Sequence, residues 1–139
     1  MRLFLDANVV FTAAPNPRGK AALVIELGVA GHWEVFSSRF AIEEARRNLQ
    51  IKYPQCLEAL NAIETRLHLA EHQTGLRFPE GLSAKDRPIF QAALACGATH
   101  LLTGDLKHFG AFLDRPDETH GIRIQTVADF LAGLLSSAS

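Results

Sequence analysis

Five acidic side chains stand where an α/β domain would build a catalytic site. Asp6 directly follows a short apolar run, and Asp105 follows another after a Thr-Gly pair. Asp86 begins a segment of helical composition, and Glu43 and Glu44 stand early in a second such segment. Active sites of parallel sheets form beyond the carboxyl ends of the strands. We therefore expect these acids, although far apart in the sequence, to meet at one edge of a sheet.

A cluster of such acids needs a cation. Carboxylates that crowd together repel one another, and their burial is costly unless positive charge neutralises them. Oxygen-only ligand sets favour hard ions such as Mg²⁺ or Mn²⁺ over Zn²⁺. Two such ions can orient and activate a water and stabilise the leaving oxygen of a phosphodiester. The acids therefore suggest metal-dependent phosphodiester hydrolysis.

Each acid also has a purely structural explanation. Asp86 is suited to cap the helix that it begins, Asp105 to cap a turn, and Asp6 to form an Asx turn. Glu43 and Glu44 would complement a helix dipole from its first turns. Taken singly, these explanations are about as strong as a catalytic role, because capping acids are common. Spacing alone leaves both interpretations open.

The segments that carry the acids alternate between strand and helix. Short apolar runs predict strands at 3–5, 32–36, 99–102 and 122–125. Apolar periodicity and helix-ending signals predict helices at 19–30, 40–53, 55–69, 86–96 and 127–135. Residues 73–83, with two glycines and a proline, predict a loop. This alternation is typical of a single α/β domain over residues 1–135, with a central parallel sheet flanked by helices. Residues 136–139 are expected to fray.

The composition restricts the class of protein. A chain of 139 residues with 47% hydrophobic and 21% charged residues suits one globular domain. No apolar run approaches the ~20 residues of a membrane span, and the opening segment is too short for a signal peptide. We therefore expect a cytoplasmic protein with no membrane partner. The net charge of −1 gives no bulk attraction to nucleic acid, so a polyanion would need a local basic patch or bridging metal ions.

A basic group follows Ser38. Arg39, Arg46 and Arg47 lie on the same predicted helix as the acid pair. Beside a nuclease site they would be candidate RNA contacts, through phosphates. An ordinary solvated helix face explains them equally well.

Histidines give weaker signals. His68 and His72 are four residues apart and would share a face if the predicted helix 55–69 continued that far. That spacing can bind zinc, but no His-Glu-x-x-His pattern accompanies it, so a metal role is not favoured. His108 follows Asp105 closely and could take part in a metal site, although a surface or packing role is the preferred interpretation.

The segments resemble the PIN-domain family, which includes the toxin halves of bacterial VapBC toxin–antitoxin pairs and related ribonucleases. The resemblance rests on five blocks: LFLDANVV at 3–10, SSRFAIEEARRNL at 37–49, SAKDRPI at 83–89, LLTGD at 101–105, and the closing strand and helix from Ile122. The blocks occur in family order over nearly the whole chain. Thr-Gly-Asp after a strand is the most specific of them.

The resemblance implies an endoribonuclease that uses Mg²⁺ or Mn²⁺. It also implies an RNA substrate, an antitoxin partner if the chain is a toxin, and a homodimer. Carried over onto this sequence, the metal ligands and catalytic residues would be Asp6, Glu44, Asp86 and Asp105. Glu44 is favoured over Glu43, and Asn8 and Thr103 would support the site. Many relatives carry a further acid shortly after Thr-Gly-Asp, but 106–109 has none, which leaves one or two metals open.

Two other functions remain as alternatives. A receiver-type or other α/β phosphate-handling domain also clusters acids at strand ends, although Asp6 lacks the acidic neighbour that a receiver needs. A non-catalytic RNA-binding domain could keep the same fold. Against that second alternative stands the electrostatic cost of clustered carboxylates that serve no purpose.

Overall fold

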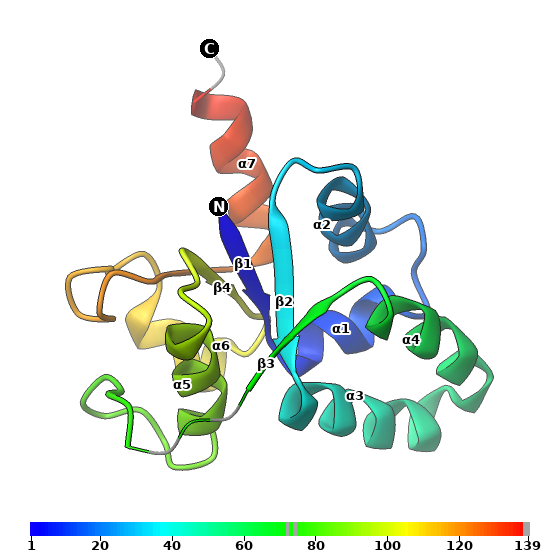
Figure 1. The fold of residues 1–139 in the computed structure, drawn as a ribbon, viewed down its shortest axis with the longest axis horizontal. Coiled ribbons are helices and arrows are strands. Elements are labelled where there is room, and N and C mark those ends of the chain that lie inside the picture. Colours follow the sequence, from blue (N-terminus) through cyan, green and yellow to red (C-terminus); the bar gives the residue numbers. More distant parts are fainter. Residues whose placement is uncertain (72, 74, 138–139) are drawn as a thin grey trace.

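Consecutive apolar residues build the central strand of the molecule. In the computed structural model, which describes residues 1–71, 73 and 75–137, β1 (Arg2–Leu5) lies between two parallel neighbours. These are β2 (Glu34–Ser38) and β4 (His100–Leu102). Two short strands complete the sheet at its margins, β3 (His68–Ala70) beside β2 and β5 (Arg123–Gln125) beside β4. All pairings are parallel, and the order is β3-β2-β1-β4-β5 (Figure 1).

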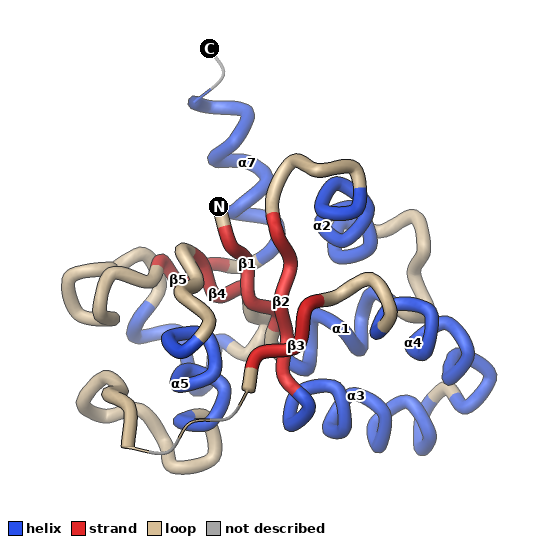
Figure 2. The backbone as a smooth tube through the Cα atoms, in the orientation of Figure 1, coloured by secondary structure: helices blue, strands red, loops and turns tan. Residues whose placement is uncertain are grey.

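Helices occupy the connections between the strands and the segment after β5 (Figure 2). They are α1 (Ala7–Ala13), α2 (Lys20–Val29), α3 (Arg39–Lys52), α4 (Leu57–Glu64), α5 (Arg87–Ala95), α6 (Leu106–Phe109) and α7 (Val127–Ser137), with 3-10 turns at Pro54–Cys56 and Gly110–Phe112. None of the helices in the described part of the chain is long and apolar enough to cross a membrane.

Two hydrophobic cores lie on opposite faces of the sheet, because successive side chains of a strand point to opposite sides. Leu3 and Leu5 face a core shared with α1, α2, α3, α4 and α7. Phe4 faces the second core, which contains Phe90 of α5 and Phe109 of α6. The side chains of Leu3, Phe4 and Leu5 are fully buried. The central strand is therefore held rigidly from both sides, and so is the residue that follows it.

The predicted strands and helices are present, but the segment after Asp6 differs from the prediction. No helix is predicted there, whereas residues 7–13 form α1. The β-branched Val9 and Val10 have low helix propensity, yet both are buried in the first core. The Asp6 carboxylate also accepts a hydrogen bond from the Ala7 N–H and so caps the helix. Tertiary packing and the cap together outweigh the local preference.

The predicted helix at 55–69 was wrong at its C-terminal end. It stops at Glu64, and residues 68–70 form β3, which pairs with 36–38 of β2. His68 therefore lies on a strand, so the helical spacing behind the zinc interpretation does not exist. His72 falls outside the described residues. A second missed element is α6, a helix of four residues that Asp105 caps.

The strand order fixes where a site can form. Connections run from β1 to β2 and β3 on one side, and then cross back to β4 and β5 on the other. The reversal lies between β1 and β4, and ligands of such sheets bind in the crevice beyond the carboxyl ends at this point. Receiver domains have the order 2-1-3-4-5. This sheet differs, so the receiver-type alternative does not fit the fold.

Candidate metal site at the carboxyl ends of β1 and β4

Asp6 is the first residue beyond β1 and lies at the reversal point of the sheet. Its side chain is buried, with 4% exposure. Oδ1 accepts the Ala7 N–H at 2.7 Å, while Oδ2 accepts hydrogen bonds from the Thr103 hydroxyl at 2.8 Å and the Asn8 amide at 3.1 Å. One oxygen thus caps α1, and the other belongs to a network that reaches across to β4.

The Thr-Gly-Asp segment after β4 is hydrogen-bonded to Asp6 and Asn8. The buried Thr103 hydroxyl donates to Asp6 and accepts the Asp105 N–H at 3.0 Å. The Gly104 N–H donates to Asn8 Oδ1 at 2.6 Å, and a Cβ at position 104 would lie 3.2 Å from that same oxygen. A larger residue would press against Asn8. Thr103 and Gly104 therefore hold the end of β4 at a fixed separation from Asp6 and the start of α1.

Asp105 lies close to His108, one helical turn further along α6. Its Oδ1 accepts the His108 N–H at 3.2 Å, and its Oδ2 lies 2.7 Å from His108 Nδ1. Partial burial opposes ionisation of Asp105. The hydrogen bonds from the His108 ring and backbone, with the positive charge of Lys85, nevertheless hold the pKa of this carboxyl below its usual range. Asp105 is therefore fully ionised at neutral pH.

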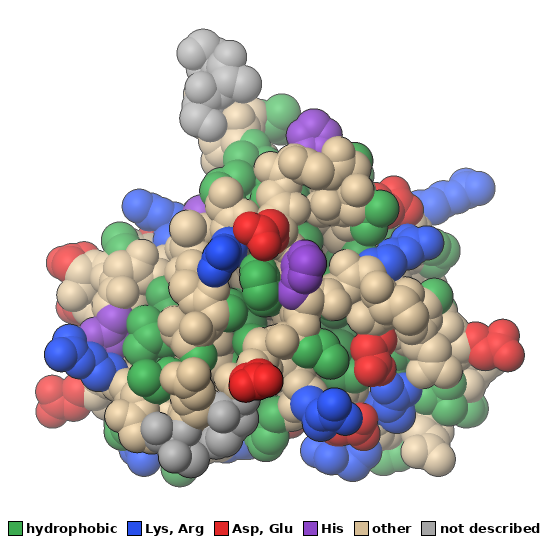
Figure 3. All heavy atoms as spheres, in the orientation of Figure 1, with side chains coloured by type: hydrophobic (Ala, Val, Ile, Leu, Met, Phe, Trp, Pro, Cys, Tyr) green, Lys and Arg blue, Asp and Glu red, His purple; other side chains and the backbone are tan. Residues whose placement is uncertain are grey.

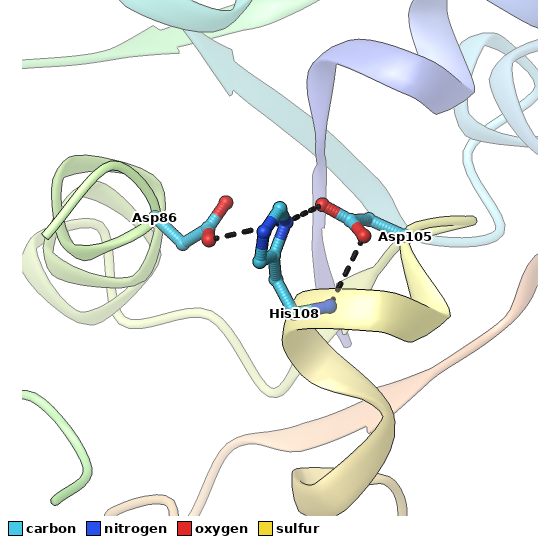
Figure 4. A group of neighbouring side chains, drawn as sticks. All are labelled: Asp86, Asp105 and His108. Atoms are coloured by element: carbon cyan, nitrogen blue, oxygen red, sulfur yellow. Dashed lines mark hydrogen bonds and ion pairs between the residues drawn. The ribbon is translucent and has the colours of Figure 1, made fainter. Parts of the chain in front are cut away.

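Asp86, at the start of α5, lies beside Asp105 and His108. It is 6% exposed, its Oδ2 accepts a short hydrogen bond from the Ser83 hydroxyl, and the same oxygen lies 3.5 Å from His108 Nδ1. Although Asp86 occupies the N-cap position of α5, its side chain makes no capping hydrogen bond. Figure 4 shows the imidazole of His108 between the two carboxylates. One ligand atom from each of Asp86, Asp105 and His108 lies within 4.8 Å of the others.

The two glutamates of α3 have different surroundings. Glu43 is exposed and forms an ion pair with Arg46 at 3.7 Å. Glu44 is half-buried, three residues after Ala41, which is packed in the same core as Phe4 and Ala7. Residues three apart share a helix face, and the charge of Glu44 disfavours ionisation of Asp6. Of the two glutamates, Glu44 is thus the one whose charge affects Asp6.

Burial makes Asp6 an unusual acid. Desolvation raises its pKa from the ordinary 3.8 to about 6, although hydrogen bonds from Thr103, Ala7 and Asn8 lower it. The nearby charge of Glu44 adds to the rise. At neutral pH the ionised Asp6 therefore carries an electrostatic cost that a nearby cation would remove. A bound divalent cation is the kind of partner that this environment favours.

We expect Thr103→Val to raise the pKa of Asp6 further. The variant keeps the shape of the buried side chain but removes the hydroxyl that stabilises the carboxylate. Hydrogen bonds to charged groups are worth about 1.5–3 kcal/mol, so the rise should be roughly one to two pH units. Carbon-detected NMR titration of the Asp6 carboxyl measures it. Thr103→Ser keeps the hydroxyl and serves as the control; equal Asp6 titration in both variants would contradict the network.

The three candidate RNA-contacting arginines have different environments. Arg46 is held by Glu64 at 2.6 Å and by Asn61 at 2.7 Å, which ties α3 to α4. Arg39 and Arg47 are exposed. Arg39 also lines a cleft of about 530 Å³ between the start of α3, the end of β3 and α5. Figure 3 shows Lys and Arg side chains grouped over α3 on one face of the molecule.

His108 lies closer to the candidate ligands than the sequence indicates. The sequence favours a surface or packing role, but the ring lies between Asp86 and Asp105. The available signal was its position three residues after Asp105, which becomes informative once α6 is known to be helical. The next acid in the sequence, Asp114, lies outside the group and pairs with Arg123 at 2.9 Å.

Comparison with known proteins identifies the fold. No family model matches the sequence, and no curated protein matches it closely enough to be a relative. Among solved structures, a chain of VapBC2 from Rickettsia felis, crystallised bound to a DNA fragment from their promoter, has a TM-score of 0.64 at 17% identity. The match covers 91% of this chain and 98% of that one. A chain of VapBC-1 from nontypeable Haemophilus influenzae has a TM-score of 0.55 at 18% identity, covering 92% and 99% respectively. The present chain therefore has the PIN-type α/β fold of these VapBC structures, as its sequence predicts.

Proposed function

We propose that this protein is a metal-dependent endoribonuclease whose catalytic and metal-binding residues are Asp6, Glu44, Asp86 and Asp105. The observation that carries the proposal is the buried Asp6 carboxylate at the reversal point of the sheet, joined to Asp105 through Thr103. Asp86 lies on the other side of His108 from Asp105, and the charge of Glu44 acts on Asp6. An acid kept at such electrostatic cost in this position is typical of a cation site.

The donor set suits Mg²⁺ or Mn²⁺. Carboxylate oxygens dominate it, and each of Asp6, Asp86 and Asp105 is oriented by a hydrogen bond from Thr103, Ser83 or His108. Metal-ligating side chains are usually oriented by hydrogen bonds of this kind. When bound, a divalent ion supplies charge stabilisation and activates a water for attack on phosphorus. Asp6 and Asp105 are held in position by the Thr103 hydroxyl, and Asn8 and Gly104 lock the loops that carry them.

The substrate is proposed to be RNA that passes over the cleft beside the acids. The cleft lies at the carboxyl ends of β2 and β3, next to the end of β1 where Asp6 stands. Adjacent strands are ~4.8 Å apart, so the cleft begins within roughly 10 Å of Asp6. Exposed Arg39 on its wall offers a positive charge to a phosphate, while Phe40 and Leu69 offer apolar surface.

Arg39→Gln should weaken RNA binding in a salt-dependent manner. Removal of one phosphate contact on a single strand lowers the slope of log affinity against log salt by about 0.7. Binding of an uncleavable RNA is measured between low and physiological salt. Arg66→Gln, which removes an exposed arginine near the opposite ends of the strands, is the control and should leave the slope unchanged. Equal slopes for the two variants would show that Arg39 does not contact the RNA.

Arg46→Gln should lower the thermal stability of the protein, because it breaks the contact with Glu64.

A role in a toxin–antitoxin pair, in the cytoplasm, is part of the proposal. The similarity to chains of two VapBC complexes supports a protein partner in the manner of an antitoxin. A homodimer is proposed on the family resemblance alone. Co-expression with the product of a neighbouring short reading frame, followed by co-purification, tests the antitoxin partner.

The enzymatic proposal is tested by incubation of the purified protein with structured and unstructured RNA. We expect cleavage with Mn²⁺ or Mg²⁺ that EDTA abolishes and that excess metal restores. RNA binding without cleavage in either metal would favour the non-catalytic RNA-binding alternative. A test with DNA of the same sequence separates ribonuclease from general nuclease activity.

A further inference from the structure

His108 occupies the space between two proposed metal ligands. Its Nδ1 atom lies 2.7 Å from Asp105 Oδ2 and 3.5 Å from Asp86 Oδ2. The ring is placed there by α6, which Asp105 begins and caps through the His108 N–H. Figure 4 shows the imidazole between the two carboxylates. His108 is half-buried, with 31% of its side chain exposed.

The separations match those between ligands of a single ion. Ligands on adjacent corners of an octahedral ion with bonds of about 2.1 Å lie about 3 Å apart, and those on opposite corners about 4.2 Å apart. The Nδ1–Asp105 and Nδ1–Asp86 distances bracket the smaller value, and the three atoms lie within 4.8 Å of one another. An ion can therefore bind all three after small side-chain movements.

The chemistry of the imidazole allows both states of the site. With the proton on Nδ1, the ring donates a hydrogen bond to Asp105 and holds the carboxylates together without a metal. With the proton on Nε2 instead, the Nδ1 lone pair is directed at the same space. Nε2 is then the donor that can orient the ring, as is usual for metal-bound histidine.

We propose that His108 Nδ1 is a metal ligand, so that the site has a mixed Asp86–Asp105–His108 set and favours Mn²⁺ over Mg²⁺. The inference rests on the proposed function, because it concerns the same metal site. Imidazole nitrogen is a poorer ligand than oxygen for Mg²⁺, whereas transition-metal ions accept it readily. Asp6, which Thr103 links to the Asp105 backbone, contributes only oxygen.

The direct test is pulsed electron paramagnetic resonance of Mn²⁺ bound to the full-length protein. We expect a hyperfine coupling from directly bound ¹⁴N, which changes to that of ¹⁵N when the protein is grown with ¹⁵N-histidine. This labelling test needs no substitution, so it does not depend on the folding of a variant. Bound Mn²⁺ with no histidine nitrogen in its coordination sphere would overturn the inference and leave His108 as a hydrogen-bond partner of the two acids.

Two matched variants assign the nitrogen. His108→Asn should abolish the coupling and weaken Mn²⁺ binding about tenfold or more, with a smaller loss for Mg²⁺. His120→Asn changes a histidine that contacts Phe90 and is not part of the triad, and it should retain the coupling. Calorimetric titration gives both affinities. A coupling that survives in His108→Asn refutes the assignment.

The outcomes separate this inference from the proposed function. No Mn²⁺ binding at millimolar concentrations would refute both. Mn²⁺ binding through oxygen alone, with EDTA-sensitive RNA cleavage, would refute the role of His108 and leave the nuclease intact. Nitrogen coupling without RNA cleavage would support the ligand and refute the nuclease.

Discussion

Asp6→Asn should abolish RNA cleavage while leaving the fold intact. Asp6 stands at the centre of the network, and even residues that only orient a metal ligand typically contribute ~10–100-fold to metal affinity or activity. Loss of the ligand itself should therefore reduce kcat/KM by more than ~100-fold. Single-turnover cleavage of a labelled RNA in Mn²⁺ measures this loss.

The control for Asp6→Asn is Asp129→Asn. Asp129 is an exposed acid in the first turn of α7, so the substitution makes the same chemical change outside the site. We expect wild-type cleavage from the control. Circular dichroism of both variants establishes that they fold. Undiminished cleavage by a folded Asp6→Asn protein would show that the buried carboxylate has no part in the chemistry.

The second large effect concerns stability and pH in the absence of metal. The folded-state pKa of Asp6 is about 6, above its ordinary value of 3.8, so the folded protein binds more protons than the unfolded chain between these values. The free energy of unfolding must therefore fall as pH rises through this window. The rise in pKa corresponds to roughly 3 kcal/mol. Urea denaturation in EDTA from pH 4 to pH 7 measures the decline.

Comparison with Asp6→Asn isolates this contribution. The variant has no carboxyl at position 6 and should lack the decline that the wild type shows. Asp105 does not mask it, because its pKa is lowered in the folded state; Asp105 stabilises the protein above its unfolded pKa and loses that contribution only as pH falls. Identical pH profiles for the wild type and the variant would refute the raised pKa.

Bound metal should oppose the fall in the free energy of unfolding as pH rises. Mn²⁺ binds the ionised carboxylate, so saturating metal at pH 7 is expected to increase the free energy of unfolding of the wild type. The same addition should stabilise Asp6→Asn less, because this variant keeps Asp86, Asp105 and His108 but lacks the Asp6 carboxylate. A stabilisation of equal size in both proteins would show that Asp6 does not bind the Mn²⁺.

The sequence by itself determined the class of fold and the acids. Runs such as Leu3–Leu5 and Leu101–Leu102 are typical of strands that a parallel sheet buries on both faces, and an acid after such a strand lies at the carboxyl edge. These are local rules, because a short apolar run and its first polar residue are adjacent in the chain. The same rules placed Asp6 and Asp105 near each other before any coordinates.

Only the tertiary structure decided the other features of the site. Residues 7–13 are helical because the core and the Asp6 cap select that state, and 68–70 form a strand because β2 offers them hydrogen bonds. Neither the core that stabilises α1 nor the β2 partner of residues 68–70 can be identified from the local sequence. The sequence favours Glu44 over Glu43 from family resemblance alone. The structure distinguishes their surroundings, because Glu44 is half-buried with a charge that affects Asp6, whereas Glu43 is exposed. His108 belongs to this group because α6, a helix of four residues, places its ring between Asp86 and Asp105. That arrangement depends on contacts between segments about twenty residues apart in the sequence.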